Sequence, residues 1–174
     1  MMCMRNAWLA FLLCLAGLFG SCLSWAGPSA EKPRPHVLIE TDRGKLTIEL
    51  LPDVAPKTVA RFTELVRKGF YNGLTFHRVV PKFLIQGGDP AGDGTGGSGQ
   101  IIPAEFSEKK HQAGTVGMAR TKHPDSADSQ FYICLEPQPF LDGKYTVFGQ
   151  VVEGLDLLPK IQENDVMRKV SLKP

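Results

Sequence analysis

Alternating apolar and polar positions begin at residue 36. Residues 36–51 read HVLIETDRGKLTIELL, with apolar side chains at every second position on both sides of Asp42, Arg43 and Gly44. A period of two is typical of strands with one buried face, and a short glycine-containing turn between two such runs indicates a β-hairpin. We therefore predict that the folded domain begins with a hairpin.

A helical spacing follows this hairpin. Pro52 and Pro56 interrupt the alternation, and apolar residues then recur every three or four positions across residues 56–68. A proline near the first helical position and a glycine just after the last one, here Gly69, are boundary signals of a helix. The pattern predicts an amphipathic helix over residues 56–68.

Short apolar runs separated by segments rich in Gly, Pro, Asp and Ser make up most of the remaining chain. They predict five further strands, at residues 74–80, 83–86, 114–119, 130–135 and 146–152. Residues 153–163 have leucines at helical spacing and predict a second short helix, although Pro159 restricts it. Residues 166–172 are expected to return as a closing strand. About eight short antiparallel strands with two helices predict a mainly β fold, a closed barrel capped by helices, because closure removes exposed sheet edges.

Composition and charge agree with one globular domain. The chain has 43% apolar residues, 18 Gly and 13 Pro, and the high Gly and Pro content indicates many turns between short elements. Twenty basic residues against 18 acidic ones leave a formal charge of +2, too small to attract a polyanion by field alone. Nucleic acid is therefore not an expected partner.

The first 26 residues have the layout of a bacterial-type export signal. Arg5 precedes an uncharged apolar run at residues 7–20, and the small residues Ser24 and Ala26 suit cleavage after Ala26. We expect a cleaved signal, an exported protein in the periplasm, a linker over residues 27–35 and a domain over residues 36–174, with no stable membrane insertion after cleavage. Lipidation at Cys22 and an uncleaved anchor remain alternatives.

Cleavage after Ala26 would leave one thiol, so no intramolecular disulfide is expected. Cys134 lies in the apolar run FYICL and is predicted to pack as a small buried group. The glycine-rich residues 92–99 lack the Lys-Ser or Lys-Thr of a phosphate cradle and indicate a polar loop. Neither a cofactor nor a metal is expected, because four histidines lack metal-ligand spacing; they are His36, His77, His111 and His123. No strained Gly-x-Ser-x-Gly turn is present, which argues against a hydrolase.

Four motifs occur in one order along the chain. Residues 76–90 read FHRVVPKFLIQGGDP, and alternation predicts that Phe76 and Arg78 share one face of a strand. GTVGMAR follows at 114–120, DSQFYI at 128–133 and FLDGKYTVFGQVVEG at 140–154. From about residue 37 to residue 170 the sequence resembles the cyclophilin family of peptidyl-prolyl cis-trans isomerases. The resemblance implies an eight-stranded antiparallel barrel capped by two helices, in agreement with the elements predicted from periodicity.

The resemblance also implies a set of site residues. Arg78 and Gln86 match the catalytic positions, as the hydrogen-bond donor and as the amide that orients the substrate backbone. Nine positions match the substrate groove: Phe83, Leu84, Ala119, Arg120, Gln130, Tyr132, Phe140, Leu141 and Tyr145. Ala119 and Arg120 match the edge along which the residues before the substrate proline lie as an extended strand.

Five of these positions depart from common family residues. Leu84 and Tyr132 replace the commoner Met and Phe, and Arg120 replaces a residue that is often Asn. Phe140 and Tyr145 stand where many eukaryotic members carry Trp and His. In the family the Trp indole N–H is associated with tight cyclosporin binding, and Phe cannot supply it, so weak cyclosporin binding is expected.

The chemistry of the implied reaction suits these residues. Rotation about an X–Pro bond has a barrier of about 18–20 kcal/mol, because the twisted amide loses its resonance. Its nitrogen becomes pyramidal and accepts a hydrogen bond, which a guanidinium can donate. We therefore expect an isomerase that acts on proline-containing unfolded or partly folded polypeptides, as a monomer. A proline-binding chaperone module of the same fold with little catalysis is the alternative.

Overall fold

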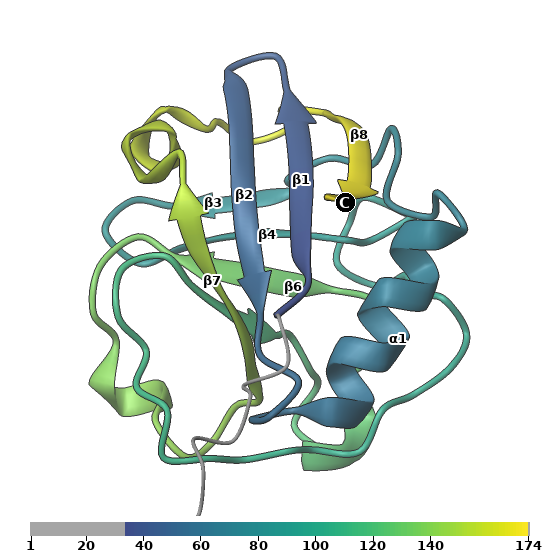
Figure 1. Ribbon diagram of the computed structural model, residues 1–174, viewed down its shortest axis with the longest axis vertical. Coiled ribbons are helices and arrows are strands. Elements are labelled where there is room, and N and C mark those ends of the chain that lie inside the picture. Colours follow the sequence, from purple (N-terminus) through teal and green to yellow (C-terminus); the bar gives the residue numbers. More distant parts are fainter. Residues whose placement is uncertain (1–33, 174) are drawn as a thin grey trace, which may run out of the picture. The chain divides into compact units, whose positions relative to one another are not determined.

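The predicted opening hairpin is confirmed in the computed structural model of the chain, which describes residues 34–173 (Figure 1). It consists of β1 (His36–Thr41) and β2 (Gly44–Leu50), which pair antiparallel. Val37 lies opposite Ile48 and Ile39 opposite Leu46, and all four side chains are fully buried. The apolar alternation read from the sequence is therefore the core-facing side of this hairpin.

One α-helix, α1 (Pro56–Arg67), follows the hairpin and buries Val59, Phe62, Leu65 and Val66. Its N-cap position, Ala55, carries no capping side chain. The carboxylate of Glu105 supplies the missing acceptor from a distant loop. It accepts hydrogen bonds from the main-chain N–H groups of Lys57 and Thr58, at 3.0 and 2.8 Å, and from the Thr58 hydroxyl. A tertiary contact thus replaces a local cap at the positive end of the helix dipole.

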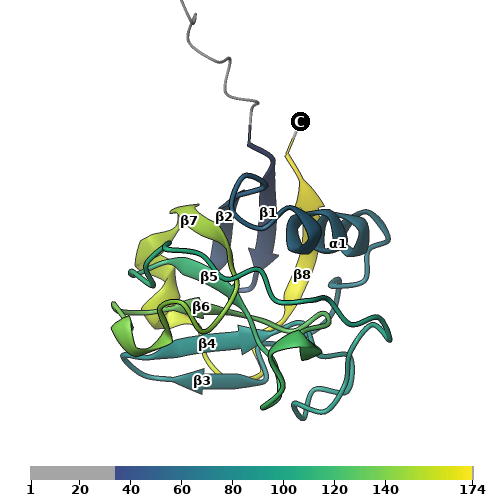
Figure 2. The same ribbon diagram turned by 90° about the horizontal axis from the view of Figure 1, so that it is seen from below.

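Six more strands complete a single antiparallel sheet. Five of them lie within one residue of the predicted runs, whereas the first begins at Arg78, four residues after the start of the predicted run 74–80. The six strands are β3 (Arg78–Val80), β4 (Leu84–Gly87), β5 (Thr115–Met118), β6 (Phe131–Cys134), β7 (Val147–Glu153) and β8 (Met167–Leu172). Their spatial order is β3-β4-β6-β5-β7-β2-β1-β8. Figure 2 shows how the sheet curls, with β3, β4, β6 and β5 layered across the direction of β1, β2 and β8.

The expected closed barrel is wrong, because the curled sheet is open between β3 and β8. These strands are the two ends of the strand order and do not pair with each other. Loop hydrogen bonds join the two edges instead: the Phe76 N–H donates to the carbonyl of Asp165, and the Asn164 N–H donates back to the carbonyl of Phe76. β3 has only three residues and begins after this contact, and the pairing across the gap is limited to an isolated bridge between Thr75 and Val166.

The second predicted α-helix is also wrong. Leu155–Lys160 forms a 3₁₀ helix, η3, with Pro159 inside it. Proline has no N–H to donate and its ring clashes with the carbonyl four residues earlier, so an α-helix cannot continue through this position. Two shorter 3₁₀ helices, η1 (Pro124–Ser126) and η2 (Pro139–Leu141), occur in loops, and α1 is the only α-helix of residues 34–173.

Two apolar clusters fill the inside of the sheet. The larger one contains the packed rings of Phe62, Tyr71, Phe131 and Phe148. The smaller one contains Leu84, Tyr132, Cys134 and Leu141, with Phe83, Ala119 and Tyr145 packed against it. Cys134 is completely buried, as predicted, and burial raises the pKa of its thiol to about 12. The smaller cluster forms the base of the site described below.

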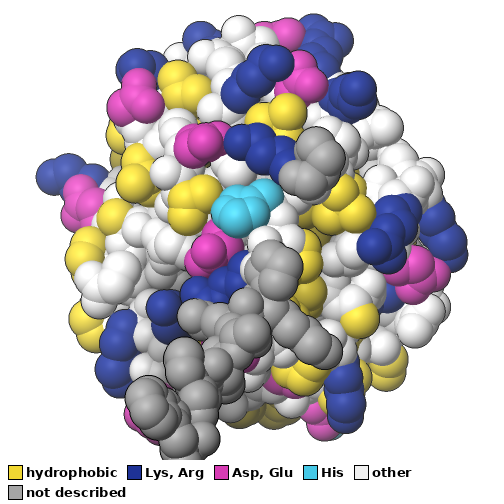
Figure 3. Space-filling view, viewed as in Figure 1, with side chains coloured by type: hydrophobic (Ala, Val, Ile, Leu, Met, Phe, Trp, Pro, Cys, Tyr) yellow, Lys and Arg dark blue, Asp and Glu magenta, His cyan; other side chains and the backbone are white. Residues whose placement is uncertain are grey.

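The charged side chains are mixed on the face that carries β1 and β2. Figure 3 shows Lys and Arg beside Asp and Glu across this face, in agreement with the small net charge. Within residues 34–173 no helix is long and apolar enough to span a bilayer. The expected signal at residues 1–26 and most of the expected linker lie outside the described residues.

Candidate active site

Ten of the eleven site residues implied by the sequence line one cavity of about 280 Å³. The cavity lies over the smaller apolar cluster, where β3, β4 and β6 meet the loops at residues 119–120 and 140–145. Its lining consists of Arg78, Phe83, Leu84, Gln86, Ala119, Arg120, Tyr132, Phe140, Leu141 and Tyr145. The eleventh residue, Gln130, lies beside this cavity and contacts Gln86.

Arg78 is held by Gln86 at the open side of the cavity. The two residues are direct partners in the β3–β4 ladder, and Nη1 of Arg78 donates to Oε1 of Gln86 at 3.2 Å. The guanidinium carbon lies 5.8 Å from the centre of the Phe83 ring. Arg78 is exposed whereas Phe76 is fully buried, so the prediction that the two residues share one face of a strand is wrong. The reason is that β3 begins only at Arg78, and alternation does not extend back to Phe76.

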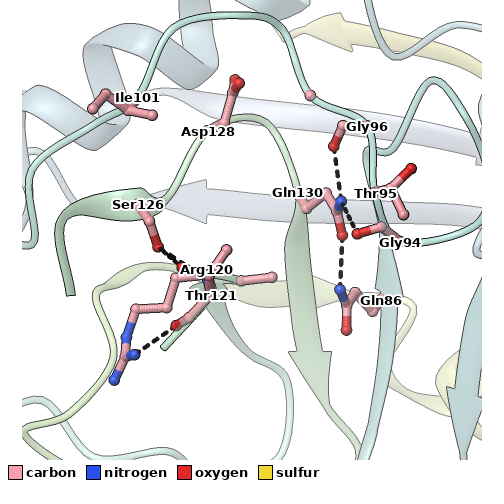
Figure 4. Close-up of a pocket in the computed structure, with 12 residues that line it drawn as sticks. Gln86, Gly94, Thr95, Gly96, Ile101, Arg120, Thr121, Ser126, Asp128 and Gln130 are labelled. Carbon is pink, nitrogen blue, oxygen red and sulfur yellow. Dashed lines mark hydrogen bonds between the residues drawn. The ribbon is translucent and has the colours of Figure 1, made fainter. Parts of the chain in front are cut away.

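A chain of amide hydrogen bonds orients Gln86. Its Nε2 donates to Oε1 of Gln130 at 2.9 Å, and Nε2 of Gln130 donates to the carbonyls of Gly94 and Gly96 at 3.0 and 2.8 Å (Figure 4). These carbonyls determine which end of each amide is the donor, so the Gln86 oxygen is left to face Arg78. The glycine-rich loop therefore sets the position of the arginine through two glutamines.

Two carboxylates hold this loop in place, the buried Asp89 and the half-buried Asp128. Asp89 accepts hydrogen bonds from the main-chain N–H groups of Ala91, Asp93 and Gly94 at 2.8, 3.0 and 2.5 Å. Asp128 accepts from the N–H groups of Ser98 and Gly99, each at 2.9 Å, and from the Ser98 hydroxyl. Burial alone raises the pKa of Asp89, but the three N–H donors outweigh it and the pKa is lowered overall.

The floor and wall of the cavity are apolar and aromatic. Leu84, Tyr132 and Leu141 are buried, and Phe83 lies at the side. The ring of Phe140 packs on Phe83 with 5.6 Å between centres and remains 57% exposed. An open slot of this size with apolar walls fits a small saturated ring.

His111 lies behind the floor and was not predicted from the sequence to belong to the site. Nε2 of His111 is 2.9 Å from the Tyr132 hydroxyl, and Nδ1 is 3.0 Å from Oδ1 of Asp142. Both His111 and Tyr132 are buried, and burial raises the pKa of the Tyr132 hydroxyl above its ordinary range. Tyr in place of the family's commoner Phe was the available signal, because a buried hydroxyl requires a partner.

Arg120 and Tyr145 line the same cavity and contact each other. The Arg120 guanidinium carbon lies 4.3 Å from the centre of the Tyr145 ring. Its Nη1 donates to the carbonyls of Thr121 and Lys122, and its Nη2 donates to the carbonyl of Lys144 at 3.0 Å. Two positions that depart from the family pattern thus contact each other.

A second cavity of about 380 Å³ adjoins the first across Gln86, Ala119 and Arg120, which line both. Gln130, Asp128 and the glycine-rich loop form its other walls (Figure 4). The sequence of residues 92–99 predicted only a polar loop and gave no indication that this loop lies at the site. Across residues 34–173, no three His, Cys, Asp or Glu side chains gather into a group that could hold a metal ion.

Comparisons with known proteins show which family the chain resembles. Residues 36–174 match the family described as cyclophilin type peptidyl-prolyl cis-trans isomerase/CLD. The chain is 47% identical over 140 residues to peptidyl-prolyl cis-trans isomerase B of Bacillus subtilis, covering 79% of this chain and 96% of that protein. It is 45% identical over 157 residues to a probable peptidyl-prolyl cis-trans isomerase of Brucella suis, covering 83% and 80%.

Solved structures show the same fold. A cyclophilin-type isomerase of Cryptosporidium parvum, determined in the presence of the dipeptide Ala-Pro, superposes with a TM-score of 0.75 at 31% identity. The match covers 80% of this chain and 99% of that one. A cyclophilin of Hirschia baltica superposes with a TM-score of 0.71 at 29% identity, covering 79% and 73%.

Proposed function

The chain belongs to the cyclophilin-type peptidyl-prolyl cis-trans isomerases, and we propose that Arg78 is the residue by which it lowers the barrier to X–Pro rotation. The observation that carries this proposal is the position of the Arg78 guanidinium, held by Gln86 at the open side of an apolar cavity. Family membership identifies the reaction as isomerisation of X–Pro bonds. The role of each side chain is our inference.

The proline ring of the substrate occupies the cavity between Phe83, Leu84 and Leu141, with the Tyr132 ring as its floor. The dipeptide Ala-Pro in the Cryptosporidium parvum structure supports a ligand of this chemistry. With the ring held there, the main chain on its N-terminal side extends along Ala119 and Arg120. Such a pose leaves the prolyl nitrogen at the side of the cavity that Arg78 faces.

Arg78 then favours the twisted amide over either planar form. In a planar amide the nitrogen lone pair is delocalised and accepts hydrogen bonds poorly, whereas in the twisted amide it is localised and basic. A guanidinium N–H directed at this nitrogen therefore binds the transition state more strongly than the ground states, which is the condition for catalysis. No covalent bond forms or breaks, and no proton is transferred.

The test is Arg78→Ala, compared with Arg67→Ala, which removes an exposed arginine at the end of α1. We expect kcat/KM for a proline peptide to fall by about 10²–10³ in the first variant, as for loss of a transition-state hydrogen-bond donor, with little change in the second. Unchanged turnover with Arg78→Ala would refute the assignment. NMR exchange spectroscopy of a bound peptide separates catalysis from the chaperone alternative, which predicts binding without faster cis-trans exchange.

We also propose that the enzyme is exported to the periplasm, where it accelerates slow proline steps in folding as a monomer. The support is the charge and apolar pattern of residues 1–26. Mass analysis of the exported protein should give an N-terminus at Gly27. A lipid-modified Cys22, or an intact N-terminus in the membrane fraction, would identify one of the two alternatives.

A further inference from the structure

Arg120 carries a positive charge that no carboxylate in residues 34–173 neutralises. Arg43, Arg61 and Arg168 each form an ion pair with a carboxylate. The guanidinium of Arg120 instead donates only to main-chain carbonyls, and its Nε is buried without a partner. Arg78 likewise forms no ion pair in this part of the chain. Two cations without a carboxylate partner in residues 34–173 therefore line the proline cavity.

The Arg120 side chain is held in position before any ligand arrives. Carbonyls from two separate loops, at Thr121, Lys122 and Lys144, accept its hydrogen bonds, and the ring of Tyr145 covers one face of the guanidinium at 4.3 Å. An arginine fixed in this way loses little side-chain entropy when it attracts an anion. Its charge can thus act on a ligand without a conformational change.

Arg120 lies where a peptide leaves the proline cavity. Together with Gln86 and Ala119 it forms the boundary between the two cavities, so a chain running from one to the other passes over it. One extended residue spans about 3.3 Å, so the two residues that precede the proline cover this boundary. Asp128, the carboxylate that lines the second cavity, accepts hydrogen bonds from Ser98 and Gly99, and Arg120 is the one cation that lines both cavities.

We propose that Arg120 makes this isomerase selective for proline segments with an acidic side chain at one of the two positions before the proline. This inference rests on the proposed function, because it requires the proline to occupy the cavity beside Arg78. The family's frequent Asn at the position of Arg120 has no charge, so a member with Asn there would lack this source of selectivity. Tyr145, another departure from the family pattern, supports it by holding the guanidinium.

The experiment measures kcat/KM for matched proline peptides that carry Glu, Gln or Lys at the first or the second position before the proline. We expect the wild type to favour Glu over Gln by about five-fold at low ionic strength at one position or both, as for a partly exposed ion pair, and to disfavour Lys. Because the screening length falls from about 10 Å at 0.1 M to about 3 Å at 1 M ionic strength, added salt should reduce the preference.

Three variants distinguish an effect of the Arg120 charge from a structural role of the Arg120 side chain. Arg120→Gln should bring the Glu-to-Gln ratio close to one, and Arg120→Lys should retain most of the preference. Lys122→Gln removes an exposed charge two residues away and should change the ratio less than Arg120→Gln. A merely structural role for Arg120 would lower turnover of all peptides equally in both Arg120 variants.

Two results would overturn the proposal: no Glu preference at either position, or a preference that persists in Arg120→Gln. Failure of the proposed function is distinguishable from both, since it would appear as unchanged turnover of the Gln peptide in Arg78→Ala.

Discussion

The hydroxyl of Tyr132 lies 2.9 Å from Nε2 of His111, behind the floor of the proline cavity. His111 in turn contacts Asp142, whose pKa is lowered first by the hydrogen bond from the His111 main-chain N–H and then by the His111 side chain. A row of three polar groups therefore runs behind the apolar floor towards the surface. It fixes the angle of the Tyr132 ring, which has to present a flat apolar face to the substrate.

Tyr132→Phe should destabilise the protein although it removes only one oxygen atom. The change leaves the buried Nε2 of His111 without its partner, and an unsatisfied buried polar group costs about 1–3 kcal/mol. We expect the free energy of unfolding, measured with urea, to fall by this amount. The value of kcat/KM should change much less, because the aromatic ring remains. Tyr145→Phe is the control, since the Tyr145 hydroxyl has no hydrogen bond to residues 34–173 in the structure. An equal decrease in the free energy of unfolding in the two variants would contradict the role of His111 as the hydrogen-bond partner of Tyr132.

Gly117 is expected to tolerate no side chain. It is the ladder partner of Tyr132, and a Cβ placed on it would lie 2.4 Å from both Cζ and Oη of that residue. Gly117→Ala should therefore destabilise the fold by about 1–3 kcal/mol through overpacking. In the Tyr132→Leu background, where the clashing atoms are absent, the added cost should nearly disappear. Additive losses in the double variant would show that the clash is not the cause.

Asp89 should make the glycine-rich loop sensitive to acid. Because its pKa is lowered in the folded state, its stabilising contribution is present above the unfolded-state pKa of about 3.9 and is lost as pH falls through the folded-state value. Asp89→Asn should lower the free energy of unfolding at pH 7, and its difference from wild type should shrink below about pH 4. Urea midpoints between pH 7 and pH 2 test this, and a difference that stays constant with pH would contradict it.

Phe140→Trp should strengthen cyclosporin binding. Phe140 is exposed at the cavity rim and packs on Phe83, so a larger ring can be accommodated there, and Trp adds an indole N–H donor. One additional hydrogen bond contributes about 0.5–1.5 kcal/mol, which corresponds to a decrease in Kd of up to about ten-fold. Calorimetric titration measures the change. Phe140→Leu, which adds no donor, is the control and should not tighten binding.

Local pattern was sufficient for most of the secondary structure. The period of two in residues 36–51 and the helical spacing after Pro56 depend on neighbours within one turn or one strand, so the residues themselves reveal β1, β2 and α1. Pro159 was also a local signal, and it excluded the α-helix that the leucine spacing favoured.

The contacts that build the site are long-range and could not be predicted from local sequence patterns. Gln86 meets Gln130 across 44 residues, and His111 meets Tyr132 across 21, because β4 and β5 both lie next to β6 in the sheet. Which strands become neighbours is decided by packing of the whole core, as is the gap between β3 and β8. The sequence by itself determined most of the strands, the helix α1, the family and the residue types of the site. Only the tertiary structure decided that the sheet is open, that His111 lies behind the floor of the cavity, and that Arg120 lines the cavity without an ion pair to residues 34–173. Each of these depends on distances between residues far apart in the chain.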